Sequence, residues 1–213
     1  MLRTADPRGN DRLLFLRKFL RHGNRIAAVA PSSPELSGAM SEQVSGSRPQ
    51  TIVELGAGTG AVTEAALERK HPGSRLVAVE LDPEFAAILR ARCPAAEVVE
   101  ADVRDLDAAL APLALGVIDL VISCLPVPSL PRGTNEALFA WLARRAGEAC
   151  FSQLTLVPWL FQATYERMFE EVRFHLVWRN LPPGGVYHCR RLRPSYADHL
   201  PGKARRRPRV ASR

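Results

Sequence analysis

Short runs of aliphatic and β-branched residues alternate along this chain with longer segments whose apolar positions have helical spacing. The short runs predict strands at 51–55, 75–80, 96–100, 117–122 and 149–157. The segments between them predict helices at 59–70, 83–91, 105–111 and 134–146. Strands that alternate with helices form a parallel sheet with helices on both faces, so the pattern predicts an α/β domain.

The pattern changes at both ends of this alternation. Segments 173–180 and 185–192 predict a C-terminal antiparallel hairpin that turns at 181–185, a run of prolines and glycines. Before the first strand, the turn at 30–34 precedes a helix predicted at 35–46. The prediction is therefore one mostly parallel sheet, extended by a hairpin and preceded by an additional helix.

The N-terminal segment 1–25 contains a predicted amphipathic helix at 11–21. Its apolar side chains fall within an arc of about 160°: Leu13, Phe15, Leu16, Phe19 and Leu20. Its opposite side is basic: Arg17, Lys18 and Arg21. Such a helix either lies in a membrane interface or packs on the domain, and the sequence leaves both open. The domain itself is placed at 26–192, followed by a basic tail, 193–213, that we expect to be disordered.

Charge is distributed unevenly over the 213 residues, whose net charge is +7. Segment 1–25 has seven basic and two acidic side chains, and segment 190–213 has nine basic and one acidic. The remaining 26–189 are acidic, with 13 basic and 19 acidic side chains. Two cationic ends on an acidic body indicate a polyanionic surface as partner, either nucleic acid or anionic lipid.

Composition and short sequence patterns argue against a membrane-spanning, an exported or a zinc-binding protein. A hydrophobic content of 46% is ordinary for a globular protein. We find neither an apolar run of the ~18 residues that a membrane span needs nor an export signal, so we expect a cytoplasmic location. The four cysteines are scattered without a zinc-binding spacing, which predicts buried thiols and neither a disulfide nor a metal site. They are Cys93, Cys124, Cys150 and Cys189.

A glycine-rich turn follows the first strand, at Gly56, Gly58 and Gly60. Alternate glycines let a backbone approach a ligand closely between a strand and a helix. Glu54 stands directly before this turn, and Glu80 ends the next strand, 24 residues after Gly56. An acid at that distance suits the hydroxyl groups of a ribose.

The acid before the turn decides between two nucleotide chemistries. A dinucleotide would bring its pyrophosphate to this turn, where a carboxylate is unfavourable. S-adenosylmethionine would instead bring an ammonium group to Glu54 and its ribose to Glu80. The expected cofactor-binding residues follow the strands of the predicted sheet: Glu54, Gly56, Ala57, Gly58, Thr59, Glu80, Leu81, Asp102, Val103 and Ser123. Asp102 beside Val103 suits an adenine, although Asp102 could also be a helix or turn cap.

The run Val53-Glu54-Leu55-Gly56-Ala57-Gly58-Thr59-Gly60 with Val79-Glu80-Leu81-Asp82 resembles class I, Rossmann-like methyltransferases. Together with Phe15–Leu20, Ala30-Pro31-Ser32-Ser33, Ser123-Cys124-Leu125-Pro126 and Val177–Pro183, it resembles the bacterial phospholipid N-methyltransferases. That resemblance implies stepwise methylation of phosphatidylethanolamine toward phosphatidylcholine at the inner face of the cell membrane, with an N-terminal helix on anionic lipid. After the fifth strand, relatives tend to carry an aromatic residue nearer to Gln153 than Trp159 is here.

The expected acceptor-binding residues are Ser32, Ser33, Leu125, Pro126, Trp178 and Tyr187. The run after the fourth strand has no aromatic side chain on which a base could stack, which counts against a nucleic-acid substrate. An rRNA adenine N-methyltransferase-like enzyme is the alternative, on account of the Arg-rich tail. Trp178 and Tyr187 are candidates for an aromatic face against methylated ammonium groups, with core packing as the alternative for Trp178.

No residue type in the sequence identifies the proton acceptor. A primary ammonium has to lose a proton before it attacks, which costs about 4 kcal/mol at pH 7. Tyr165, His188 and His22 are conceivable bases, and a surface or packing role is the favoured interpretation of each. The expected transfer is direct, without a metal.

Overall fold

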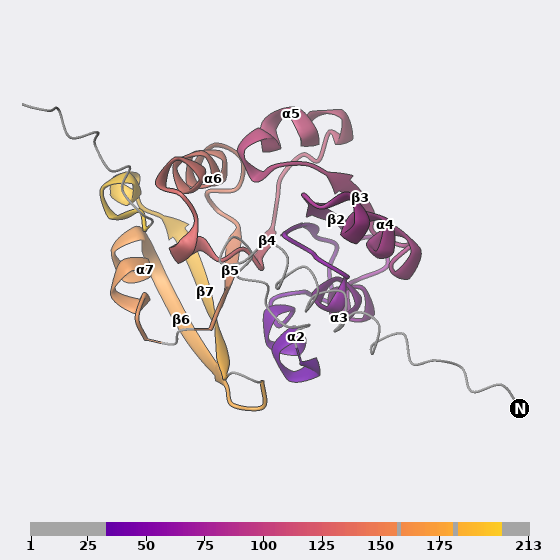
Figure 1. Cartoon of the computed structure of the whole chain (residues 1–213), viewed down its shortest axis with the longest axis horizontal. Coiled ribbons are helices and arrows are strands. Elements are labelled where there is room, and N and C mark those ends of the chain that lie inside the picture. Colours follow the sequence, from indigo (N-terminus) through magenta and orange to yellow (C-terminus); the bar gives the residue numbers. More distant parts are fainter. Residues whose placement is uncertain (1–32, 157–158, 181–182, 202–213) are drawn as a thin grey trace, which may run out of the picture.

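A computed structural model describes residues 33–156, 159–180 and 183–201. Within these residues, seven strands form one sheet in the order β3-β2-β1-β4-β5-β7-β6 (Figure 1). Strands β1 to β5 pair in parallel, and β7 runs antiparallel between β5 and β6. The strands are β1 (Thr51–Leu55), β2 (Arg75–Glu80), β3 (Glu97–Glu100), β4 (Leu120–Ser123), β5 (Cys150–Thr155), β6 (Phe169–Val177) and β7 (Gly184–Leu192). The predicted α/β architecture with a C-terminal hairpin is confirmed.

Helices cover both faces of this sheet. On one face lie α2 (Pro34–Met40), α3 (Ala61–Arg69) and α4 (Pro83–Arg92), and on the other lie α5 (Leu106–Leu110), α6 (Arg132–Arg145) and α7 (Gln162–Met168). Short 3₁₀ turns follow β3, α5, β4 and β7: Val103–Asp105, Ala111–Leu113, Val127–Ser129 and Pro194–His199. The larger buried cluster lies between the sheet and α5–α7, and includes Phe139, Phe151 and Phe169.

Several expected elements differ from those observed. The helix predicted at 35–46 ends at Met40, where the hydroxyl of Ser41 bonds back to the carbonyls of Ser37 and Gly38. Helix α7 was not predicted, because seven residues are too few for a helical period to stand out. The strand expected at 117–122 begins only at Leu120, and Val117 is exposed.

The two ends of the chain are described only in part. The predicted helix at 11–21 lies outside the described residues, as do 202–213. The prediction that the tail 193–213 is disordered is wrong for residues 193–201, which the structure describes. A 3₁₀ helix spans Pro194–His199, Leu200 is buried, and the side-chain amide of Asn135 donates to the carbonyl of Pro201 at 2.8 Å. No helix in the described residues is long and apolar enough to span a bilayer.

Gly60 gives a direct test of how α3 packs on α4. Its φ is +94°, and a Cβ there would lie 2.8 Å from Leu89 Cδ1 and 3.0 Å from Cys93 Sγ. We expect Gly60→Ala to lower the free energy of unfolding by about 1–3 kcal/mol, from backbone strain and overpacking. Urea denaturation measures it, with Gly133→Ala as control, since a Cβ at Gly133 meets nothing within 4 Å. Equal midpoints for the two variants would contradict the described packing.

Candidate cofactor and acceptor site

The glycine turn lies over the carboxyl ends of β1 and β2. The φ values of Gly56, Gly58 and Gly60 are +73°, +58° and +94°. Residues other than glycine rarely adopt these backbone angles. The amides of Gly56 and Ala57 donate to the carbonyl of Val79 at 2.9 and 3.2 Å. The turn is therefore bound to the end of β2 at the edge of the sheet where ligands of such folds bind, with Gly56 and Gly58 partly exposed.

Glu80 holds this turn in place. Its two carboxylate oxygens accept hydrogen bonds from the amides of Gly58, at 2.8 Å, and Asp82, at 2.9 Å. A carboxylate has about four lone-pair positions, so two remain for the hydroxyl groups of a ribose. Leu81 follows directly and is 62% exposed, which leaves an apolar face for an adenine ring. The arrangement fits the predicted role of both residues.

Glu54 is fully buried at the end of β1. One carboxylate oxygen accepts a 2.7 Å hydrogen bond from the hydroxyl of Thr63 on α3, and the other has no hydrogen-bond partner among the described residues. Burial raises the pKa of Glu54 to about 8, and the charge of Glu80 adds to the shift. An ammonium group is the partner that would both complete the hydrogen bonds and compensate the charge, so the residues fit S-adenosylmethionine.

Asp102 follows β3 beside the end of β2, where the amide of Ala101 donates to the Glu80 carbonyl. Its carboxylate accepts from the Arg104 amide at 2.8 Å and from the Arg104 guanidinium at 2.7 Å. This bonding lowers the pKa of Asp102. The cap that the sequence left open is therefore present, and a contact of Asp102 with an adenine stays a prediction. Val103 beside it is half-buried against the core.

The segment after β4 touches the glycine turn. A Cβ on Gly56 would lie 2.8 Å from Leu125 Cδ2, and the amide of Cys124 donates to the carbonyl of Leu55. Ser123, at the end of β4, is fully buried. The segment that the sequence assigned to the acceptor therefore contacts the glycine turn through Leu125, and the acceptor role of Leu125 and Pro126 stays a prediction.

Two segments that the sequence analysis singled out, the turn before α2 and the turn between β6 and β7, are in contact although they are distant in the chain. The amide of Ser33 donates to the side-chain oxygen of Asn180 at 3.2 Å, while the Ser33 hydroxyl caps α2. The turn before α2 is thereby tied to the β6–β7 turn. Trp178 in that turn is 69% exposed, so core packing is wrong for it. Ser32 lies outside the described residues.

Tyr187 has a different position from the one expected. It is fully buried on β7, with ring centroids 4.8 Å from both Tyr165 and Phe174. Neither face of its ring is open to a headgroup, so the expectation of an exposed aromatic face is wrong here. Successive strand residues point to opposite faces, and the sequence did not fix which of Tyr187 and His188 faced the core.

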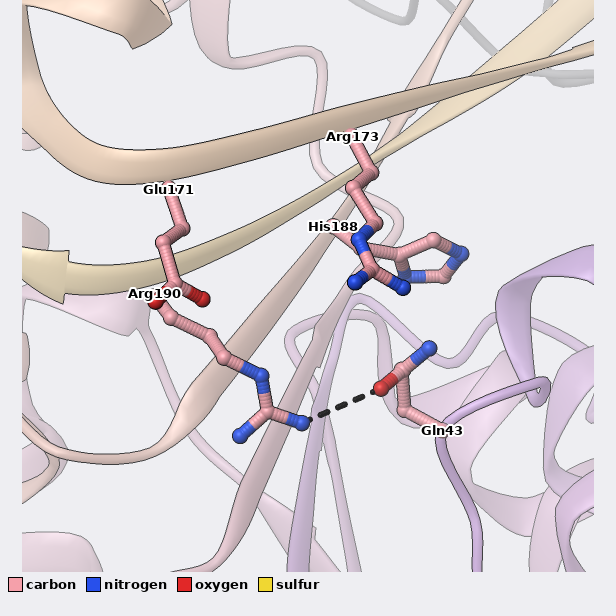
Figure 2. Close-up of a pocket in the computed structure, with 5 residues that line it drawn as sticks. All are labelled: Gln43, Glu171, Arg173, His188 and Arg190. Atoms are coloured by element: carbon pink, nitrogen blue, oxygen red, sulfur yellow. Dashed lines mark hydrogen bonds between the residues drawn. The ribbon is translucent and has the colours of Figure 1, made fainter.

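The two candidate bases that the structure describes, Tyr165 and His188, do not lie at the glycine turn. Tyr165 is buried in the core on α7, and His22 lies outside the described residues. His188 lies on the opposite face of β7 from Tyr187, in a pocket of about 180 Å³ (Figure 2). The pocket is lined by Gln43, Glu171, Arg173, His188 and Arg190. Burial lowers the pKa of His188, whose ring hydrogen-bonds to Ser152 at 2.8 Å. His188 therefore belongs to a separate polar cluster.

Sequence reasoning missed the side chains that join these segments. Gln153 on β5 donates from its amide to the carbonyl of Leu125 at 2.8 Å, and Asn135 on α6 donates to the carbonyl of Val127 at 2.8 Å. Thr63 bonds to Glu54. Only the spacing of Thr63, on the first turn of the helix after the glycines, offered a signal in the sequence.

Known proteins resemble this chain both in sequence and in structure. Residues 52–147 match the family model described as a methyltransferase domain. An ornithine lipid N-methyltransferase from Singulisphaera acidiphila is 43% identical over 190 residues, which cover 87% of this chain and 99% of the relative.

Two solved structures share the fold at low sequence identity. The O-methyltransferase TomG from Streptomyces achromogenes, in complex with S-adenosylmethionine, has a TM-score of 0.59 and 16% identity, covering 89% of this chain and 92% of TomG. An O-methyltransferase from Bacillus cereus, in complex with S-adenosylhomocysteine, has a TM-score of 0.58 and 16% identity, covering 89% of this chain and 93% of that protein.

Proposed function

The chain belongs to the class I S-adenosylmethionine-dependent methyltransferases, and we propose that it methylates the amine nitrogen of a membrane aminolipid. S-adenosylmethionine is its cofactor. The observation that carries the proposal is the 43% identity to an ornithine lipid N-methyltransferase along almost the whole of that relative. We infer that an ornithine lipid is the acceptor here too.

The distribution of exposed apolar side chains supports a lipid substrate. Among the described residues, the large exposed ones are Leu81, Val117, Trp159, Leu160 and Trp178. All but Val117 follow β2, β5 or β6, whose carboxyl ends lie at the edge that carries the glycine turn. Tryptophan and leucine are favoured at a bilayer interface. An enzyme that docks this edge on a membrane would bring its cofactor turn to the lipid headgroups.

The residues in the site suit a direct transfer. When bound, S-adenosylmethionine supplies a methyl group activated by a sulfonium centre. Glu54 would hold the ammonium group and Glu80 the ribose of the cofactor, and Leu125 contacts the glycine turn from the segment where the acceptor is predicted to bind. The amine must arrive without its proton, and a water-poor, largely apolar rim favours the neutral form of an amine.

Phosphatidylethanolamine is the second candidate acceptor. It is favoured by the Ser33 turn and the Trp178–Asn180 segment, which resemble those of phospholipid N-methyltransferases and are joined by the hydrogen bond between Ser33 and Asn180. Both lipids present a primary ammonium near an anion, which is a carboxylate in an ornithine lipid and a phosphate in phosphatidylethanolamine. Because both lipids bring the same primary amine, recognition of the amine alone does not distinguish them.

Purified protein and labelled S-adenosylmethionine test the proposal. Vesicles that contain ornithine lipid, vesicles that contain phosphatidylethanolamine, and stripped ribosomal RNA are incubated separately. We expect label in the ornithine lipid, with phosphatidylethanolamine labelled more slowly. Label in RNA and in neither lipid would replace this proposal by the nucleic-acid alternative.

We also propose that segment 1–25 binds anionic membrane at the inner face of the cell. Each basic side chain near such a surface contributes about 1 kcal/mol, and the segment has seven. Deleting residues 1–25 is expected to lower partitioning onto vesicles of phosphatidylglycerol at least tenfold at low salt, measured by sedimentation. Salt should weaken binding of the full chain more than that of the truncated one. Equal partitioning of both would place the membrane contact elsewhere.

A further inference from the structure

A second polar site lies on β6 and β7, around the pocket of about 180 Å³ that contains His188 (Figure 2). Its side chains lie on the face of the hairpin opposite Tyr187, toward the segment that follows α2. Arg190 follows Cys189, which pairs with Phe151 near the amino end of β5. The glycine turn lies at the carboxyl ends of the parallel strands, so this pocket is separate from the cofactor edge.

The pocket contains two guanidinium groups that form no ion pair with a carboxylate in the described part of the chain. The guanidinium of Arg173 has no hydrogen-bond partner there either. The guanidinium of Arg190 donates to the side-chain oxygen of Gln43 at 3.1 Å, which is a neutral partner. Arg173 pairs directly with His188, and Glu171 with Arg190, so both arginines lie on one face of the hairpin. Figure 2 shows them extending from the hairpin toward Gln43.

The acid that lines the pocket already has a partner. Glu171 accepts a hydrogen bond from the guanidinium of Arg191, which also binds Glu170 at 2.9 Å. Arg191 has a φ of +54°, so the chain departs from strand geometry at the residue that reaches both acids. Arg191 therefore offsets the charge of Glu171, and the two unpaired guanidinium groups leave the pocket positive.

His188 forms the floor of the pocket and is 7% exposed. Its Nδ1 hydrogen-bonds to the hydroxyl of Ser152 at 2.8 Å. Its Nε2 lies 3.4 Å from the carboxylate of Glu42 at a geometry short of a hydrogen bond, and has no other partner among the described residues. The same carboxylate hydrogen-bonds to His175 at 3.3 Å, which lowers the pKa of Glu42. When Ser152 donates to Nδ1, the proton of the neutral ring is on Nε2, which is then a buried donor.

We propose that this pocket binds a phosphate group. The two planar guanidinium groups supply paired N–H donors in the geometry that fits phosphate oxygens, and His188 Nε2 adds a donor from the floor. A volume of about 180 Å³ is below the ~300–1,000 Å³ of sites for drug-sized molecules, which indicates a small ligand. Because the pocket is separate from the cofactor edge, this ligand is neither the methyl donor nor the methyl acceptor.

The position of the pocket favours a soluble phosphate over a lipid headgroup. The exposed Trp159 and Trp178 follow β5 and β6, at the carboxyl end of β5. Arg190 lies at the amino end of the same strand. An enzyme that docks on a bilayer through the two tryptophans would hold the pocket away from the headgroups. We therefore expect free phosphate or a small phosphate monoester.

A bound phosphate would join α2 to the hairpin. Gln43 comes from the segment after α2, and Arg173 and Arg190 come from β6 and β7. At the other end of α2, the hydrogen bond from Ser33 to Asn180 connects the helix to the turn between the same two strands. A ligand that binds only the folded arrangement raises its stability as the site fills. Phosphate should therefore raise the melting temperature.

Calorimetric titration of the full chain with potassium phosphate tests the site, while potassium chloride keeps the ionic strength constant. We expect about one phosphate per chain, with a dissociation constant below about 1 mM. Arg173→Gln and Arg190→Gln should each weaken binding by about tenfold or more, the effect of one lost hydrogen bond between charged groups. Arg145→Gln is the matched control, because Arg145 is exposed on α6, on the opposite face of the sheet, and has no ion pair among the described residues.

The control should bind phosphate like wild type, and circular dichroism shows whether each variant is folded. Wild-type protein without saturable phosphate binding would overturn the inference, as would equal affinities of Arg173→Gln and Arg145→Gln. Vesicles of phosphatidic acid, compared with vesicles of phosphatidylcholine, test the lipid source of the same group. Binding to phosphatidic acid that requires Arg173, without binding of free phosphate, would overturn the soluble ligand and assign the pocket to a headgroup.

Discussion

A chain with Glu80→Ala is expected to bind S-adenosylmethionine about 100-fold more weakly than wild type, which corresponds to two lost hydrogen bonds to a charged group. Glu80 has two free lone-pair positions beside the glycine turn, and both would serve the ribose. The substitution also removes the acceptor for the amides of Gly58 and Asp82. The turn itself therefore loses its anchor, and the affinity falls for both reasons.

Isothermal titration calorimetry measures this effect, and circular dichroism shows whether the variant is folded. Glu100→Ala is the control, since Glu100 also ends a strand but, within the described part of the chain, pairs only with Arg90 at 4.0 Å on the surface. Control and wild type should bind equally. A folded Glu80→Ala chain with wild-type affinity would show that the cofactor does not lie along β2.

Glu54→Gln is expected to change how stability depends on pH and how many protons are released when the cofactor binds. The folded chain holds a proton on Glu54 up to its pKa of about 8, while the unfolded chain loses it near 4.5. Between these pH values the folded state binds more protons, so wild-type stability falls as pH rises and stays lower above 8. The Gln variant lacks this slope and should be more stable at pH 9, by an amount on the order of 4 kcal/mol.

The same substitution should impair cofactor binding. At pH 7, Glu54 has to ionise to receive an ammonium group, so wild type should release about one proton for each cofactor bound. Calorimetry in two buffers of different ionisation enthalpy measures that proton. Glu54→Gln should release none and bind at least tenfold more weakly, because a neutral amide replaces the counter-charge. Equal proton release by both chains would mean that the cofactor ammonium does not reach Glu54.

The cofactor end of the site could be predicted from motifs and spacings that lie close together in the sequence. Gly56, Gly58 and Glu80 sit in one βαβ unit, where spacing along the chain largely determines position in space. Asp82 directly before Pro83 also has the local pattern of a helix cap, and in the structure its carboxylate accepts from the amides of Glu84 and Phe85.

The acceptor end depended on contacts that no local pattern encodes. Ser123 and Gln153 become neighbours only when β5 joins β4, and Ser33 meets Asn180, which lies 147 residues further along the chain. A hairpin predicted without its register leaves the faces of Tyr187 and His188 undecided, because a shift of one residue exchanges them.

Lipid analysis of a host without methylated aminolipids tests the central claim most directly. The full chain and Glu80→Ala are expressed in parallel, and the aminolipids are examined by mass spectrometry. We predict new species heavier by one CH₂ for each methyl added, with the headgroup nitrogen as the modified atom, in cells with the full chain only. An unchanged aminolipid profile, with the protein folded and able to bind S-adenosylmethionine, would contradict methyl transfer to a lipid amine.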